Sequence, residues 1–194
     1  MRISLWFLSF ALIFINLEQI RSQDTVAIVD EYLHSQIQKN KLETIEYVIT
    51  SKHISSISNV EHFYFSQTLF GVQIVGTNSS VHINSTNEMI SDSNHFIKDL
   101  RNRRFKNSSP VISPLKAIDL AANQLGYEIT EDLNILSKKQ GASEDYIISS
   151  GGISLTPFPA KLKYFPLDNG DLELVWEIAF QQLDHEHWWN IHTS

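Results

Sequence analysis

The sequence of 194 residues contains no cysteine. Without cysteine the chain has no disulfide bonds, no thiolate ligands for zinc or iron–sulfur clusters, and no cysteine nucleophile. Positive charge is also scarce, because 15 Lys and Arg face 22 Asp and Glu, and the longest basic cluster is the short stretch 101–104. Surfaces that bind nucleic acid need clustered positive charge. We therefore do not expect nucleic acid to be a partner.

The sequence also lacks an apolar run of the ~20 residues that a membrane-spanning helix needs. Its longest run, residues 5–17, follows Met1 and Arg2 and is typical of a secretory signal peptide. The alternative, a retained membrane anchor, would require a longer run. We expect a signal peptide at 1–22 with cleavage after Ser22, and a secreted, extracellular product.

Hydrophobic residues make up 42% of the chain, which is enough to build a core. Two segments have helical spacing. Asp24 caps a predicted amphipathic helix over 25–39, and Ser113 with Pro114 begins a second helix that ends at Gly126. The apolar positions of the second helix are Leu115, Ile118, Ala121, Ala122 and Leu125.

The remaining chain favours strands. Short alternating segments separated by Gly, Asn and Ser predict one curved antiparallel sheet over 45–98. Residues 137–157 are rich in Ser and Gly and predict a loop, and three strands follow at 160–165, 172–180 and 187–191, with a hairpin turn at 168–170. The predicted fold class is α+β, with two small subdomains, each a helix packed on a curved antiparallel sheet.

Few residue patterns point to chemistry. His185 and His187, with His192 nearby, are the best metal candidates, but the helical H-E-x-x-H motif of zinc peptidases is absent, and a polar turn is the favoured interpretation. We find no G-x-S-x-G elbow and no phosphate-binding loop. Two further patterns have ordinary structural readings: a solvated acidic face (Asp119, Glu128, Glu131, Asp132), and tryptophans that serve core and sheet packing rather than sugar binding (Trp176, Trp188, Trp189). The N-x-S/T sequons at Asn78, Asn84 and Asn107 would be surface acceptors in a host that glycosylates, but chance matches are expected because Ser and Asn are abundant here.

One stretch carries a family resemblance. The run from Tyr47 to Phe65, followed by Gln67 and then by 70–77, resembles the fungalysin/thermolysin propeptide domain, and the helix at 113–126 with the strands at 162–189 resembles a PepSY-type second half. Asn59 stands where the family often has Gly, and Thr77 where it often has Asn. The residues that match the propeptide motif are Tyr47, Ser51, His53, Ser55, Val60, His62, Tyr64, Gln67, Gly71, Val72, Val75, Trp188 and Trp189.

The resemblance implies a propeptide domain at 23–99, a linker at 100–112 and a PepSY-like subdomain at 113–194. It implies a prosegment that assists the folding of a secreted zinc metallopeptidase and inhibits it. The chain itself lacks H-E-x-x-H, so we expect no enzyme activity, catalytic residue or cofactor in it, and zinc only in a catalytic domain outside it. The expected partner is the cognate peptidase, in cis or in trans. Two alternatives remain: a stand-alone secreted inhibitor or binding module, and an enzyme that uses His185, His187 and His192.

Overall fold

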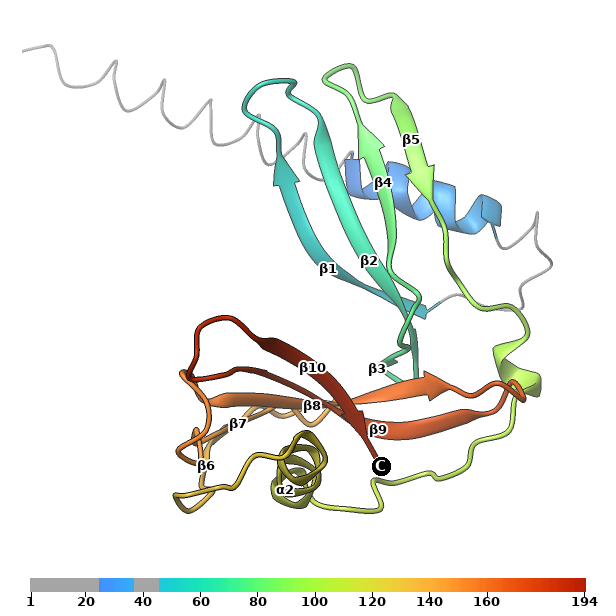
Figure 1. The fold of residues 1–194 in the computed structure, drawn as a ribbon. Coiled ribbons are helices and arrows are strands. Elements are labelled where there is room, and N and C mark those ends of the chain that lie inside the picture. Colours follow the sequence, from blue (N-terminus) through green and yellow to red (C-terminus); the bar gives the residue numbers. More distant parts are fainter. Residues whose placement is uncertain (1–24, 37–45) are drawn as a thin grey trace, which may run out of the picture. The chain divides into compact units, whose positions relative to one another are not determined.

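The computed structural model describes residues 25–36 and 46–194 (Figure 1). The predicted signal peptide, its cleavage point, the cap Asp24 and positions 37–39 lie outside the described residues. The chain divides into two compact units. The first holds the helix at 25–36 with Ile49–Phe65 and Ser79–Lys98, and the second holds Glu46–Val48, Ser66–Asn78 and Asp99–Ser194. Each unit has a helix and an antiparallel sheet, which confirms the α+β prediction.

The first sheet follows the order β1-β2-β4-β5, and the short β3, whose residues belong to the second unit, also pairs with β2. The strands are β1 (Glu46–Ile54), β2 (Glu61–Leu69), β3 (Val72–Gln73), β4 (Ser79–Ile83) and β5 (Met89–Ser93). Successive side chains of a strand point to opposite faces. One face is apolar and is covered by the helix at 25–36, so the core comprises Val29, Tyr32, Leu33, Phe63, Phe65, Val81 and Ile83.

The sheet of the second unit follows the order β10-β9-β8-β7-β6. Its strands are β6 (Ile135–Lys138), β7 (Tyr146–Ile148), β8 (Phe158–Pro166), β9 (Leu172–Gln181) and β10 (Trp188–Thr193). The helix α2 (Pro114–Leu125) packs against β9 and β10 (Figure 1). The opposite, open face of the sheet carries polar side chains, among them those of Lys161, Lys163 and Glu177.

The predicted boundaries of the second helix are confirmed. The Ser113 hydroxyl accepts a hydrogen bond from the Lys116 backbone nitrogen at 3.2 Å, Pro114 opens the helix, and Gly126 ends it with φ 80°. The buried face is rotated from the predicted one, because Ala117 is fully buried whereas Leu115 and Leu125 are half-buried. Small side chains therefore bring the helix close to the sheet.

Two predictions about strands in the second unit are wrong. The predicted loop at 137–157 contains the end of β6 and all of β7, which pairs with β8 through Tyr146, Ile147 and Ile148. The predicted last strand also continues past 191, because His192 and Thr193 pair with Glu177 and Trp176. In both places the pairing comes from a neighbouring strand, which local composition does not reveal.

The prediction that the three C-terminal tryptophans serve core and sheet packing is wrong for Trp188. Trp176 is 1% exposed, whereas Trp188 is 69% exposed. Trp188 and Trp189 are neighbours on β10, so they point to opposite faces of the sheet. Trp189 lies opposite Phe180 on the covered face and is half-buried. Only one of the pair can face the core.

The segment at 100–112, predicted as a linker, is bound along the second unit. Phe105 forms a parallel bridge with Leu172, and the Lys106 backbone nitrogen donates to the Leu172 carbonyl at 2.9 Å. The Lys106 side chain also pairs with Glu173 at 2.6 Å. The segment therefore extends the β8–β9 hairpin.

Candidate functional site

Two of the predicted motif histidines meet on the open face of the first sheet. His53 of β1 stacks on His62 of β2, with ring centroids 4.8 Å apart and planes inclined by 20°. His62 in turn lies opposite His82 of β4, and their Nδ1 atoms are 2.8 Å apart. We call His53, His62 and His82 the histidine ladder. Tyr64, another motif residue, contacts the rings of both His53 and His82.

The ladder has no anionic neighbour on its own face among the described residues. Next to His82, β5 places Ser91 and β4 places Ser80, whose hydroxyl is 3.2 Å from His82 Nε2. The nearby charges belong to the other side of the sheet, where Lys52 pairs with the buried Glu61 at 2.8 Å and Asp92 accepts a hydrogen bond from Tyr32. Burial lowers the pKa of His82, and the charges of His62 and His53 lower it further.

This arrangement predicts that acid destabilises the first unit. Two Nδ1 atoms 2.8 Å apart share one proton as donor and acceptor, and they cannot both carry one. Because the pKa of His82 is lower in the folded state, the favourable contribution is present above the ordinary value of about 6.5 and is lost as pH falls through the folded pKa. We expect a loss of about 1 kcal/mol or less, since solvent screens this half-exposed pair.

Amide hydrogen exchange in β4, followed from pH 8 to pH 5, measures this effect. The protection factor of the wild-type chain, which is the intrinsic exchange rate at each pH divided by the observed rate, should fall more steeply with acid than the protection factor of His82→Gln. His34→Gln is the matched control, because His34 is an exposed histidine on the helix of the same unit, with its Nδ1 2.7 Å from the Asp30 carbonyl oxygen. Identical pH dependence of the protection factors for the wild type and His82→Gln would refute a contribution from His82.

A second group of motif residues forms a hairpin at 66–78 that belongs to the second unit. Gln67 is 1% exposed, and its carbonyl accepts a hydrogen bond from the Ile74 backbone nitrogen at 2.9 Å. Ile74 bridges Tyr164 of β8, and the Val75 backbone nitrogen donates to the Tyr164 carbonyl at 2.9 Å. The hairpin thus places a short segment beside the end of β8, at Tyr164. Val72 is buried in the same hairpin.

The backbone explains both departures from the family pattern. Asn59 has φ 55°, a left-handed conformation that suits Gly and that Asn tolerates. Thr77 is fully buried, and its hydroxyl donates to the Ile74 carbonyl at 2.7 Å while accepting from the Gln67 backbone nitrogen at 3.1 Å. Asn59 and Thr77 are therefore each compatible with the turn in which they lie.

Gly71 provides a test of the hairpin. It has φ 77°, and a Cβ there would lie 3.0 Å from the Ala142 Cβ, whereas Gly76 has φ 81° and open space around it. We expect Gly71→Ala to cost about 2–3 kcal/mol, from left-handed strain plus crowding, and Gly76→Ala about 1–2 kcal/mol, from strain alone. Urea denaturation followed by tryptophan fluorescence measures both. Equal losses would mean that the hairpin does not press against Ala142.

The other motif residues are spread over the chain. Tyr47 and Ser51 lie on β1, and Ser55 closes the following turn by accepting a hydrogen bond from the Asn59 backbone nitrogen at 2.9 Å. Val60 ends that turn, since its carbonyl accepts a hydrogen bond from the Ser55 backbone nitrogen at 2.9 Å. These positions do not converge on one site, and they shape the hairpin between β1 and β2.

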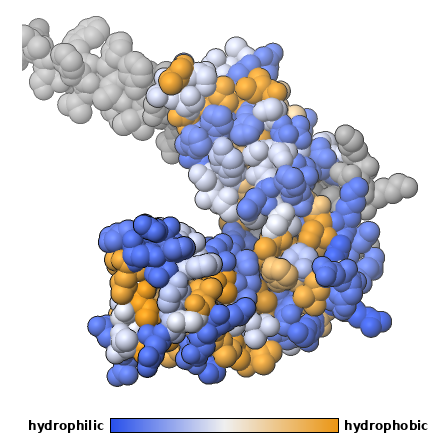
Figure 2. Space-filling model, in the orientation of Figure 1, coloured by the Kyte–Doolittle hydropathy of each residue, from blue (hydrophilic) through white to orange (hydrophobic). Residues whose placement is uncertain are grey.

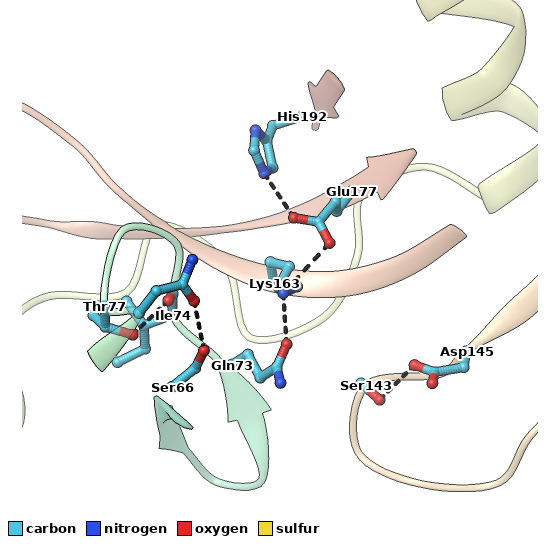
Figure 3. A network of polar contacts seen from close by, with 10 residues as sticks. Ser66, Gln73, Ile74, Thr77, Ser143, Asp145, Lys163, Glu177 and His192 are labelled. Atoms are coloured by element: carbon cyan, nitrogen blue, oxygen red, sulfur yellow. Dashed lines mark hydrogen bonds and ion pairs between the residues drawn. The ribbon is translucent and has the colours of Figure 1, made fainter. Parts of the chain in front are cut away.

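A polar network crosses the open face of the second sheet (Figure 3). Lys163 of β8 lies between Gln73 and Glu177, with Nζ 2.5 Å from Gln73 Oε1 and 3.4 Å from Glu177 Oε1. His192 of β10 reaches the other oxygen of Glu177 at 3.3 Å. The network therefore joins the hairpin at 66–78 to the last strand. Sequence reasoning missed Lys163 and Glu177, because nothing in the local pattern pairs them with Gln73.

Burial shifts the pKa values of Lys163 and Glu177 in this network. It lowers the pKa of Lys163, and the carboxylate of Glu177 offsets only part of that effect. Burial alone would raise the pKa of Glu177, but hydrogen bonds and charges from His192 and Lys163 outweigh it and hold the pKa below its usual range. The charged form of each side chain is therefore favoured by the other.

A groove of about 320 Å³ lies beside the network, on β6 to β9. Its lining includes the apolar Ile147, Pro159 and Ala179 and the charged Lys161 and Glu177. Hydrophobic side chains also interrupt the hydrophilic surface of the second unit at several places (Figure 2). A groove lined by apolar residues together with a few charged ones suits a side chain of a protein or peptide.

The favoured interpretation of the histidines at 185–187 is confirmed: they lie in a polar turn before β10. His185 has φ 63°, and His187 pairs with Asp184 and stacks on Trp189. His192 contacts Glu177 and Phe165. Within 25–36 and 46–194, no group of three or more His, Cys, Asp or Glu side chains is placed to hold a metal ion. None of the helices in those ranges is long and apolar enough to cross a membrane.

Comparison with known proteins gives distant relatives of one kind. No family model matches the chain. It is 23% identical over 179 residues to the extracellular metalloproteinase mep of Aspergillus niger, which is 90% of this chain and 28% of that protein. It is 24% identical over 151 residues to extracellular metalloproteinase 1 of Arthroderma otae, and 24% identical over 156 residues to extracellular metalloproteinase MEP of Leptosphaeria maculans. These matches cover 74% and 76% of this chain and 23% of each relative.

The chain thus spans about a quarter of the length of the curated relatives that it matches. The resemblance to fungalysins is confirmed as distant homology to a part of these enzymes.

Proposed function

We propose that this distant relative of one part of the fungal extracellular metalloproteinases is the propeptide region of a secreted zinc metallopeptidase. It assists the folding of the peptidase domain and keeps it inactive until cleavage removes it. The observation that carries the proposal is the uneven coverage, since the homology takes in 90% of this chain but only 28% of the Aspergillus niger relative. Homology to one part of such an enzyme supports the task of that part for this chain.

The fold supports this role physically. A prosegment must fold before its enzyme does, and here each of the two sheets buries aromatic residues in a core that has no disulfides. The open face of the second sheet then offers a preformed surface with an apolar groove. Preformed surfaces lose little conformational entropy on binding, and interfaces of standard size reach dissociation constants from micromolar to picomolar.

The proposal is tested by adding the purified, secreted chain to a mature extracellular metalloproteinase of the same organism, freed of its own prosegment. We expect dose-dependent inhibition with a dissociation constant of about 1 μM or tighter, and a higher yield of active enzyme when the denatured peptidase refolds in its presence. The heat-unfolded chain is the control. No inhibition and no gain in refolding yield would overturn the proposal.

The groove supplies a matched pair of variants for that assay. Ile147 in the groove and Leu155 outside it are both 37% exposed, so Ile147→Arg and Leu155→Arg disturb the fold to a similar extent. An arginine placed in the contact with the peptidase costs about 2–5 kcal/mol of binding free energy. An arginine outside that contact costs little. We expect inhibition to weaken at least tenfold for Ile147→Arg alone. Equal inhibition by both variants would place the interface elsewhere.

The second candidate is a stand-alone secreted inhibitor that acts on a peptidase in trans. The same groove favours it, because binding through a preformed surface does not require a covalent link between the partners. Inhibition in trans fits both candidates. Only the gene itself separates them, through the presence or absence of a peptidase reading frame joined to this one.

A further inference from the structure

The sequons at Asn78, Asn84 and Asn107 play no part in the proposed function, and the structure distinguishes between them. An asparagine side-chain nitrogen carries two hydrogens, and N-glycosylation replaces one of them with a sugar. A folded protein therefore tolerates a glycan where one of the two hydrogens is not needed. At Asn84 and Asn107 the hydrogen bonds of the side-chain amide decide the outcome.

Asn84 meets this requirement. It begins the turn between β4 and β5, and the rest of that turn, residues 85–88, is exposed. Its Nδ2 donates to Glu88 Oε2 at 2.9 Å, which uses one hydrogen, and the described residues offer the other no acceptor. Its Oδ1 accepts from the Thr86 backbone nitrogen and hydroxyl and from the Glu88 backbone nitrogen, at 2.8–2.9 Å. A glycan on Nδ2 leaves all these bonds in place.

Asn107 does not meet the requirement of one unused side-chain hydrogen. Its Nδ2 donates both hydrogens, to the Leu174 carbonyl at 3.2 Å and to the Ser109 carbonyl at 3.3 Å. Its Oδ1 accepts from the Leu174 backbone nitrogen at 2.9 Å. The side chain therefore pairs with β9 as a strand would, next to a leucine that is 5% exposed. A sugar on Nδ2 would break at least one of these bonds.

We propose that Asn84 is an N-glycan acceptor and that Asn107 stays unmodified in the folded protein. In the transfer, Asn84 Nδ2 bonds to the anomeric carbon of an oligosaccharide carried on a lipid pyrophosphate. The bond from that carbon to the pyrophosphate oxygen breaks, the lipid pyrophosphate leaves, and the amide nitrogen loses one proton. The proposal rests on the export proposed above and not on the inhibitory role.

The test expresses the full chain, with its own leader, in a yeast that glycosylates exported proteins. Peptide N-glycosidase in heavy-oxygen water then converts each formerly glycosylated asparagine to a labelled aspartate, and mass spectrometry reads each sequon separately in the medium and in the cells. We expect label at position 84 in most molecules and none at 107 in the secreted pool.

Two variants remove one sequon each without touching its asparagine. Thr86→Ala should abolish the label at 84, and Ser109→Ala should change nothing at any site. An unlabelled Asn84 in both pools, or a labelled Asn107 in the secreted, folded pool, would overturn the proposal. Either result can coexist with full inhibition of the peptidase, so the failure of this inference and the failure of the proposed function are distinguishable.

Discussion

Trp176→Ala is expected to unfold most of the second unit at physiological temperature. Trp176 is 1% exposed, contacts the ring of Tyr146, and donates its Nε1 hydrogen to the Ile112 carbonyl at 2.9 Å. Removing a buried tryptophan leaves a cavity and costs about 3–5 kcal/mol, and the Ile112 carbonyl loses the hydrogen bond from Nε1. Total stabilities are about 5–15 kcal/mol, so this loss is a large fraction.

Trp188→Ala is the matched control, because Trp188 lies on β10 of the same unit and is 69% exposed. We expect a change within about 0.5 kcal/mol, as for most exposed positions. Urea denaturation followed by circular dichroism compares the two variants without relying on tryptophan emission. If both variants lost the same stability, the core of the second unit would not be centred on Trp176.

Lys163→Met is expected to destabilise the second unit by about 2–3 kcal/mol. The side chain of Lys163 is 13% exposed, and methionine fills a similar volume without the charge. The substitution leaves the carboxylate of Glu177 half-buried with His192 as its remaining ion-pair partner, and it removes the donor to Gln73. Because Gln73 lies on the hairpin at 66–78, we expect that hairpin to loosen first.

Lys116→Met is the control for the charge itself. Lys116 pairs with Asp119 at 2.6 Å, but its side chain is 54% exposed, and exposed pairs contribute about 0–1 kcal/mol. Urea midpoints measured by tryptophan fluorescence should therefore drop clearly for Lys163→Met and little for Lys116→Met. The double variant Lys163→Met/Glu177→Leu should recover part of the loss, since it removes the unpaired charge. Similar midpoints for the two single variants would exclude a structural role for the network.

Features set by neighbouring residues were predictable from the sequence. The helix α2 carries its own start and stop signals in Ser113, Pro114 and Gly126, so its bounds need no tertiary information. The hairpin between β8 and β9 likewise follows from alternating apolar residues around the turn that ends at Gly170, whose φ is 87°. Residues that are neighbours in the sequence determine such elements.

Features that depend on distant pairing were not predictable. All four residues of β6 are exposed, so the strand lacks the buried alternation that reveals a strand in a sequence. His82 joins His62 only because β4 pairs with β2 in one register, across 20 positions of the chain. Gln73 and Lys163 meet across 90 positions. Side chains this far apart are brought together by topology, which a single sequence does not encode in any local pattern.

The central claim, that this chain is the prosegment of a larger zinc peptidase, is tested most directly by the nucleotide sequence downstream of codon 194. The account predicts a continuing reading frame that encodes H-E-x-x-H on a helix, where the two histidines bind zinc and the glutamate acts as base. Reading all three forward frames guards against a frameshift. A confirmed stop codon with no such frame behind it would contradict the claim and leave a free secreted inhibitor as the remaining explanation.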